Sequence, residues 1–390
     1  MTDNNSIKDG SIIPEDKNRQ LSLPAEMVNR GLEIASRIEF QSNIQKYQKP
    51  IRYFSGTRAR SLIDFSKDGK VALITANSND NPDLIIWNVS NGTFSNLSSL
   101  EKGFDNLGYL GHGRIWSMTL SSHGNLALVG YDTYDMLCWD VNNGQVISRH
   151  MRGWNTEPIE YLQFLPESEQ CVEIYNYGAS IIDAKSGETI RYIDGINLVN
   201  SLVFSKDGTQ LLVATHELKI LDIENKREPK IFKGAINIEA ASMFPEPGKI
   251  VSMNSGGLIT VWNTITGEVI SQWFHANPSL PSEAGNIIPE EQWMFFTLDD
   301  EIQKERHNNN WGGIERMIRC KRRSVDVSPD GTKILSGGGD NYMHLWTLDG
   351  QEICRYPHYT YVVKVAFLPD GCFALSGCLD GSVYLWELPG

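Results

Sequence analysis

The feature that most constrains this fold is a C-terminal stretch, Val363 to Leu388, that recurs in less regular form through most of the chain. It reads VKVAFLPDGCFALSGCLDGSVYLWEL, and a turn signal at Asp370-Gly371 separates its first two apolar segments. This pattern predicts three short antiparallel strands that end on an aromatic anchor, Trp386. Copies extend back to about Ser61. One such unit cannot bury its apolar face alone, so successive units must pack against one another.

The anchor position sets the period of the repeat. It is occupied, in chain order, by Trp87, Trp139, Ile182, Leu221, Trp262, Trp346 and Trp386. Successive anchors lie 52, 43, 39, 41, 84 and 40 residues apart, and a four-stranded propeller blade needs about 40–45 residues. The interval of 84 residues is two periods, with room for a hidden unit around 293–298. The spacing therefore favours eight units, and seven units with an insertion are the alternative.

The units resemble those of the WD-repeat family of β-propellers, from about Ser55 to the end of the sequence. The resemblance depends on the Ser-Pro-Asp-Gly turn, the Ser-Gly strand and the tryptophan anchor, which are clearest in SVDVSPDGTKILSGGGDNYMHLWTL and in the C-terminal stretch. It implies an all-β, closed β-propeller of four-stranded antiparallel blades. It also implies a buried, hydrogen-bonded tetrad in the last unit, formed by His358, Ser376, Asp380 and Trp386.

This tetrad has the residue types of a nucleophilic catalytic set, but we expect it to be structural. Buried hydroxyl, imidazole, carboxylate and indole groups satisfy one another's hydrogen bonds and so lock a blade. The preceding unit has Ser336, Asp340 and Trp346 but no histidine at the matching position. The sequence therefore predicts one complete tetrad, in the last unit.

Three regions are expected along the chain. Residues 1–21 are polar and mixed in charge, which is typical of a flexible tail. Residues 22–48 are predicted to form an N-terminal amphipathic helix, and one face of it would carry Met27, Gly31, Ile34, Ala35 and Ile38. Residues 49–390 form the propeller, closed by pairing of strand 51–54 with the C-terminal blade. Helix 22–47 either packs on the propeller or serves as a second docking element.

Composition narrows the class of function. A formal net charge of -13 would repel a polyanion, which makes nucleic acid an unfavourable partner. No apolar run approaches the roughly 18 residues of a membrane span, and the polar N-terminus lacks a signal-peptide core, so a cytoplasmic protein is expected. Neither the six cysteines nor the histidines show metal-ligand spacing. We therefore expect no metal and no cofactor.

The residues expected to bind a partner are aromatic and arginine side chains on one face of the ring, the top face. The resemblance to WD-repeat propellers implies that this face carries the turns between second and third strands and the links between blades. The candidates are Arg114, Tyr131, Tyr134, Trp154, Tyr175, Tyr177, Arg322, Arg323, Tyr342, Tyr359 and Tyr361. The two last arginines belong to a basic cluster, 316–323, that would suit an acidic or phosphorylated segment of a partner.

These features predict a non-catalytic protein-interaction scaffold, or a subunit of a larger assembly, that binds a partner protein or peptide on the top face. No catalytic residue is assigned, because paired acids such as Asp299-Asp300 fall in predicted turns, where carboxylates are usually solvated. Two alternatives stay open. One is a propeller enzyme or small-ligand-binding protein with a site in the central channel, and the other is a nucleic-acid-associated subunit that uses the basic cluster.

Overall fold

The computed structural model describes ten segments of the chain. They are residues 49–55, 62–77, 82–97, 115–131, 135–151, 159–175, 178–196, 199–224, 227–275 and 323–390. The predicted tail at 1–21 and the predicted helix at 22–48 lie outside these segments. Within the described ranges, no helix has the length and apolar character that crossing a membrane requires.

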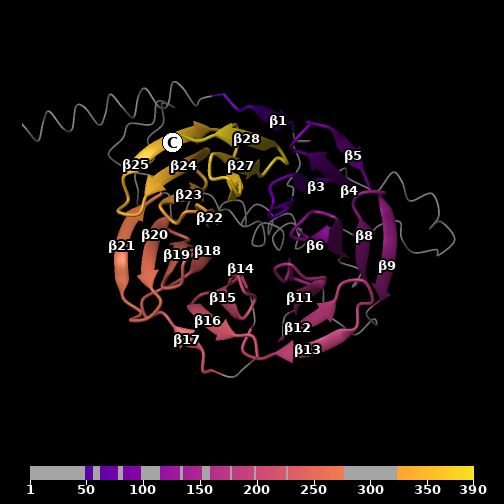
Figure 1. Cartoon of the computed structure of the whole chain (residues 1–390), viewed down its shortest axis with the longest axis horizontal. Helices are drawn as coiled ribbons and strands as arrows, with labels where there is room; N and C mark the ends of the chain where they lie inside the picture. Colours follow the sequence, from indigo (N-terminus) through magenta and orange to yellow (C-terminus); the bar gives the residue numbers. More distant parts are fainter. Residues whose placement is uncertain are drawn as a thin grey trace, which may run out of the picture. The chain divides into compact units, whose positions relative to one another are not determined.

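Seven four-stranded antiparallel sheets, the blades, follow one another around a ring (Figure 1). Blade 1 contains β2 (Ile63–Phe65), β3 (Val71–Asn77), β4 (Pro82–Asn88) and β5 (Phe94–Asn96). Blade 2 contains β6 (Ile115–Leu120), β7 (Leu126–Tyr131), β8 (Asp135–Asp140) and β9 (Gln145–Met151). Blade 3 contains β10 (Tyr161–Phe164), β11 (Gln170–Tyr175), β12 (Gly178–Asp183) and β13 (Thr189–Ile193). Blade 4 contains β14 (Ser201–Phe204), β15 (Gln210–Ala214), β16 (Leu218–Asp222) and β17 (Lys230–Ile231).

The remaining blades follow the same order, from the inner strand to the outer strand. Blade 5 contains β18 (Ile238–Met243), β19 (Lys249–Asn254), β20 (Leu258–Asn263) and β21 (Val269–Phe274). Blade 6 contains β22 (Ser324–Val327), β23 (Lys333–Gly337), β24 (Tyr342–Thr347) and β25 (Glu352–Pro357). Blade 7 contains β26 (Val362–Phe367), β27 (Phe373–Cys378), β28 (Val383–Glu387) and, as its outer strand, β1 (Arg52–Phe54).

The spacing left two blade counts open, and the structure has the smaller one, seven blades. Each of the seven clusters of buried apolar side chains lies between two neighbouring blades, and together they occupy every interface around the ring. Blades 5 and 6, on either side of the interval of 84 residues, pack directly against each other, with the ring centroids of Trp273 and Trp346 6.1 Å apart. The preference for eight was therefore wrong, because the described residues form seven sheets and place no further one between blades 5 and 6.

Packing between blades also explains the burial pattern along each strand. The second and third strands of a blade lie against both neighbouring blades, so β27 is buried at five consecutive positions. Outer strands have one solvent-facing side, and β21 accordingly has exposed residues at four of its six positions. The anchor position is buried in every blade, including blades 3 and 4, where Ile182 and Leu221 replace tryptophan.

The first described strand completes the last blade. β1 pairs antiparallel with β28, with Arg52 opposite Leu385 and Phe54 opposite Val383. The strand expected at 51–54 therefore pairs with the C-terminal blade, and Ile51 extends the pairing by donating its N–H to the Leu385 carbonyl at 2.8 Å. Ring closure by this strand covers what would otherwise be the open edge of β28.

Polar side chains tie the inner strands of neighbouring blades together. Asp64 of β2 accepts a hydrogen bond from the Leu120 N–H of blade 2 at 2.9 Å, and its other oxygen pairs with Lys364 Nζ of blade 7 at 3.0 Å. Asp326 of β22 likewise accepts from the Phe367 N–H of blade 7 at 2.8 Å. Carboxylates on inner strands therefore bridge adjacent blades on the side that faces the ring axis.

Candidate functional site

Six of the eleven candidate partner-binding residues lie within the described segments, and they differ in how much surface they offer. Arg114, Tyr134, Trp154, Tyr177 and Arg322 lie outside those segments. Tyr359, in the link between β25 and β26, is 93% exposed. Tyr131 is partly buried and packs against the core between blades 1 and 2. Tyr175, Tyr342 and Tyr361 are also partly buried. Tyr359 is therefore the described candidate that presents its ring most openly.

Arg323 makes interactions within the molecule. Its Nη2 donates to the Ser255 carbonyl at 2.6 Å, and its Nε lies 3.3 Å from Glu239 Oε2. Both partners belong to blade 5, whereas Arg323 immediately precedes β22 of blade 6. This arginine therefore ties blade 5 to blade 6. Within the basic cluster 316–323, it is the residue that the structure describes.

In blade 7, the structure joins three residues of the expected tetrad. Ser376 Oγ accepts a hydrogen bond from Trp386 Nε1 at 2.7 Å and lies 2.6 Å from His358 Nε2. The other imidazole nitrogen of His358 lies 2.9 Å from the Tyr356 carbonyl, to which it donates. Asp380 instead accepts from the Ser382 N–H at 2.9 Å and stabilises its own turn. Both nitrogens of His358 are thus occupied without the carboxylate.

Blade 6 holds the complete tetrad, and its histidine is His275. Trp346 Nε1 donates to Ser336 Oγ at 2.7 Å, and Ser336 Oγ lies 2.8 Å from His275 Nδ1. His275 Nε2 lies 3.0 Å from Asp340 Oδ1. The expectation that this unit has no histidine was wrong. His275 follows β21 of blade 5 directly, as His358 follows β25 of blade 6.

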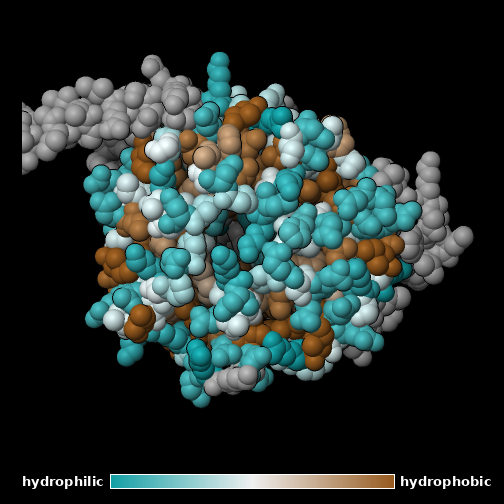
Figure 2. All heavy atoms as spheres, viewed as in Figure 1, coloured by the Kyte–Doolittle hydropathy of each residue, from teal (hydrophilic) through white to brown (hydrophobic). Residues whose placement is uncertain are grey.

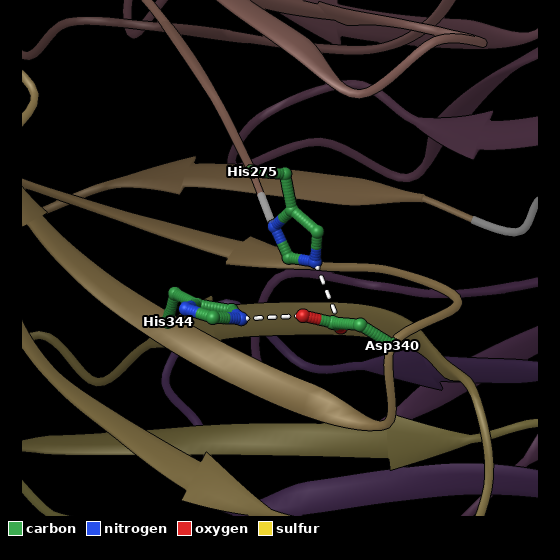
Figure 3. Close-up of side chains that lie close together, drawn as sticks. All are labelled: His275, Asp340 and His344. Atoms are coloured by element: carbon green, nitrogen blue, oxygen red, sulfur yellow. Dashed lines mark hydrogen bonds and ion pairs between the residues drawn. The ribbon is translucent and has the colours of Figure 1, made fainter. Parts of the chain in front are cut away.

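A second histidine extends this tetrad (Figure 3). His344 Nε2 lies 2.7 Å from Asp340 Oδ2, so the carboxylate lies between two imidazoles. His344 Nδ1 lies 2.5 Å from Glu352 Oε1. A ring with a carboxylate at each nitrogen must donate from both, and His344 is therefore the imidazolium. We call His275, Asp340, His344 and Glu352 the blade 6 cluster.

The environment fixes the charge of each group in the blade 6 cluster. Burial opposes a charge on His344, but the carboxylates of Asp340 and Glu352 outweigh it and raise the pKa of His344 to about 9. Burial lowers the pKa of His275, which is thus the neutral ring. Burial opposes ionisation of Asp340, but the two imidazoles hold its pKa well below the ordinary value. The cluster therefore contains one cationic and one neutral histidine around a carboxylate.

The sequence carried a signal for His275 that its spacing concealed. A histidine directly after the fourth strand of a unit occurs twice, as His275 and as His358. The second lies 18 residues before its serine, whereas the first lies 61 residues before Ser336. A search for a histidine at a fixed distance before the serine therefore finds His358 alone. A search for a histidine directly after the preceding fourth strand finds both His275 and His358.

The ring axis carries a small cavity between the inner strands of blades 7, 1, 2 and 3. Its volume is about 130 Å³, and its polar lining includes Asp64, Glu160, Tyr161 and Lys364. Asp64 uses both oxygens in bonds to neighbouring blades. Burial raises the pKa of Tyr161, which keeps the phenol protonated. Within this lining, Asp64 and Lys364 join blade 1 to blades 2 and 7.

Surface hydropathy differs between the centre and the edge of the ring. Figure 2 shows hydrophilic residues around the centre of one face and hydrophobic residues mainly towards the periphery. Many exposed large apolar residues lie on the outer strands, among them Tyr53, Phe94, Ile147, Tyr192, Ile231 and Ile270. Tyr359 lies instead in a link between blades, away from this outer set.

Comparisons with known proteins agree with this architecture. A family model described as "WD domain, G-beta repeat" matches residues 321–347 and 350–387, which include strands of blades 6 and 7. Among curated proteins, the chain is similar to eukaryotic translation initiation factor 3 subunit I of Eremothecium gossypii, with 23% identity over 229 residues. That alignment covers 57% of this chain and 54% of the relative, so the chain spans about half the length of the curated relative.

A solved structure shares the fold over most of the chain. A chain in the crystal structure of a mitotic checkpoint complex matches with a TM-score of 0.61 and 16% identity. The match covers 88% of this chain and 96% of that chain. At this identity the likeness shows the common fold alone.

Proposed function

We propose that this chain, whose described residues form a seven-bladed β-propeller and whose residues 321–347 and 350–387 match WD40 repeats, acts as a non-catalytic interaction scaffold or as a subunit of a larger protein assembly. The similar curated protein is named as a subunit of a translation initiation factor, which supports a role inside an assembly. Because one propeller fold can serve many functions, a more specific function has to be argued from the binding site. We place the partner, a protein or peptide, on the top face.

The observation that carries this placement is the exposure of Tyr359. Tyr359 is 93% exposed, although the residue before it, His358, is fixed by two hydrogen bonds. A rigid backbone that presents an exposed tyrosine is typical of binding hot spots, because the ring buries a large area while losing little conformational entropy. The tyrosine at 361 lies two residues further along the same link and adds to this surface.

The finer proposal is that an acidic or phosphorylated segment of the partner binds the basic cluster 316–323. Its support is the sequence, in which five basic residues fall within eight positions of an acidic protein. Arg323 is held by Ser255 and Glu239, so the other basic residues of the cluster would make this contact.

The test uses two exposed tyrosines of the propeller. Tyr359→Ala should reduce capture of the partner that copurifies with the wild-type chain by at least about tenfold, as expected when a hot-spot aromatic is removed. Tyr192→Ala is the matched control, because Tyr192 is 68% exposed but lies on an outer strand. Binding should then be measured again with the purified partner. Equal binding by both variants, with loss only on deletion of 22–47, would show that the N-terminal segment is the docking element.

A further inference from the structure

We propose that the blade 6 cluster binds a divalent transition metal ion, Zn²⁺ by preference, through His275, Asp340 and His344. Each residue offers one ligand atom, and the three atoms lie within 4.8 Å of one another (Figure 3). Two imidazole nitrogens and a carboxylate oxygen form a donor set that suits zinc. The site adjoins the proposed partner-binding surface, because Tyr342 donates its N–H to Asp340 Oδ1 at 3.2 Å. Metal binding is nevertheless measured without the partner, so this proposal is tested independently of that function.

The outer hydrogen bonds orient both rings for this role. His344 Nδ1 faces the Glu352 carboxylate at 2.5 Å, and His275 Nδ1 faces Ser336 Oγ at 2.8 Å. Metal-binding histidines in proteins use such partners to fix the tautomer and the orientation of the ring. The consequence is that the Nε2 atom of each ring points towards the same carboxylate, that of Asp340.

Proton positions change in a defined way when a metal ion enters. Both Nε2 atoms must present lone pairs, since a protonated nitrogen cannot bind a metal. His344 would release its Nε2 proton and keep the Nδ1 proton directed at Glu352. His275 would carry its proton on Nδ1, directed at Ser336 Oγ, which then accepts from this ring and from Trp346. One proton is therefore released for each ion bound.

Burial and position indicate what the ion would do. The side chains of His275, His344 and Asp340 are only 2%, 3% and 12% exposed. His275 comes from the end of blade 5, where its N–H bonds the Gly257 carbonyl at 2.8 Å, and the other two ligands come from blade 6. A bound ion would thus link two blades, at the point where the chain leaves blade 5 for residues 276–322.

A comparison of the blades shows that the second histidine belongs to blade 6. The position two residues before the anchor is occupied, in blades 1 to 7, by Ile85, Leu137, Ser180, Lys219, Thr260, His344 and Tyr384. Blade 7 has its own histidine, His358, but Tyr384 stands where a second nitrogen ligand is needed. Blade 7 is therefore an internal control for an imidazole in the same fold without the metal-binding set.

The experiment measures metal binding by the full chain after treatment with a chelator and dialysis. Calorimetry with Zn²⁺ should show one tight site, and Co²⁺ should give visible absorption bands of a low-symmetry protein site. His344→Gln should abolish both signals, because it leaves a single histidine ligand. The glutamine amide can still donate to Asp340, so this hydrogen bond is kept. Glu352→Gln should weaken Zn²⁺ binding by about 10–100-fold, as expected for an outer-shell partner. His358→Gln should bind like the wild type.

Two results would overturn the proposal. One is absence of saturable Zn²⁺ or Co²⁺ binding to the wild-type chain, and the other is equal binding by wild type and His344→Gln. Zn²⁺ should also raise the midpoint of thermal unfolding of the wild type and of His358→Gln, since a ligand of the native state stabilises it. If His344→Gln does not fold, the Zn²⁺ affinities of Glu352→Gln and His358→Gln are compared instead. Equal Zn²⁺ affinities of these two variants would refute the site.

Discussion

A buried indole in blade 2 provides a direct test of how these blades are held together. In blades 5, 6 and 7 the anchor tryptophan donates its Nε1–H to a serine on the second strand, at 2.7 to 2.9 Å. In blade 2 the position of that serine is occupied by Val129, which is fully buried. The Nε1 atom of Trp139 is buried there without a hydrogen-bond partner. A buried donor without a partner costs about 1–3 kcal/mol.

Val129→Thr should recover much of the free energy of unfolding that the unpaired Trp139 N–H costs, because threonine is close to valine in shape and adds an acceptor facing Trp139. The hydroxyl itself costs about 1–3 kcal/mol to bury when it has no partner. The matched control is Val213→Thr. Val213 occupies the same position in blade 4 and is also fully buried, but the anchor there is Leu221, which has no N–H to donate. The control should therefore carry the full cost of the hydroxyl.

The expected result is a difference between the two variants. Val213→Thr should lower the free energy of unfolding by about 1–3 kcal/mol, whereas Val129→Thr should leave it within about 1 kcal/mol of the wild type or raise it. Urea denaturation followed by far-UV circular dichroism measures both. Equal losses in the two variants would refute the reasoning, since they would show that the Trp139 indole gains nothing from an acceptor at position 129.

Two further predictions concern acid stability and a close contact between blades. Burial lowers the pKa of His358 to about 3. Below its ordinary value of 6.5 the unfolded chain therefore takes up a proton that the folded chain does not, and stability falls as the pH drops. Protonation of His358 in the unfolded chain should lower the free energy of unfolding by about 2 kcal/mol at pH 5 relative to pH 7. His358→Gln should therefore reduce the stability lost between pH 7 and pH 5, measured by urea denaturation, by that amount. An unchanged loss would contradict the assignment. Gly350 has φ +85°, and a Cβ there would lie 2.8 Å from the Trp273 ring of blade 5. Gly350→Ala should therefore lower the thermal midpoint more than Gly234→Ala, because Gly234 has φ +89° but open space around it; equal shifts would show that the Trp273 contact is unimportant.

Local pattern predicted the architecture of single blades well. Alternation and turn residues located the strands around Val363 to Leu388, and the anchor positions were found even where Ile182 and Leu221 replace tryptophan. These features follow from interactions a few residues apart, which a sequence displays directly. Strand 51–54 differs in this respect, because the β28 edge with which it pairs lies about 330 residues further along the chain.

The errors came from relations that span a long interval. The spacing of 84 residues is compatible with either an insertion or a degenerate unit, and the direct packing of blade 5 on blade 6, including the contact between Trp273 and Trp346, distinguishes them. The same interval separates His275 from Ser336 and concealed the complete tetrad. Asp380 was assigned by spacing, but the orientation of the His358 ring directs its second nitrogen to a backbone carbonyl. Ring orientation depends on packing in three dimensions and has no signature in the spacing.

The pairing of β1 with β28 also has a kinetic consequence. Phe54 and Val383 are adjacent in space but separated by about 330 residues, and the other six sheets lie in the intervening chain. Closing so long a loop in an unfolded chain costs about 3 kcal/mol more than closing one of about 10 residues, and three residue pairs do not offset that cost by themselves. The pairing becomes favourable only after the rest of the ring has brought the two strands together. It should therefore be the last structure to form on folding and the first to open, so that amide hydrogens of β1 exchange with solvent before those of any central strand.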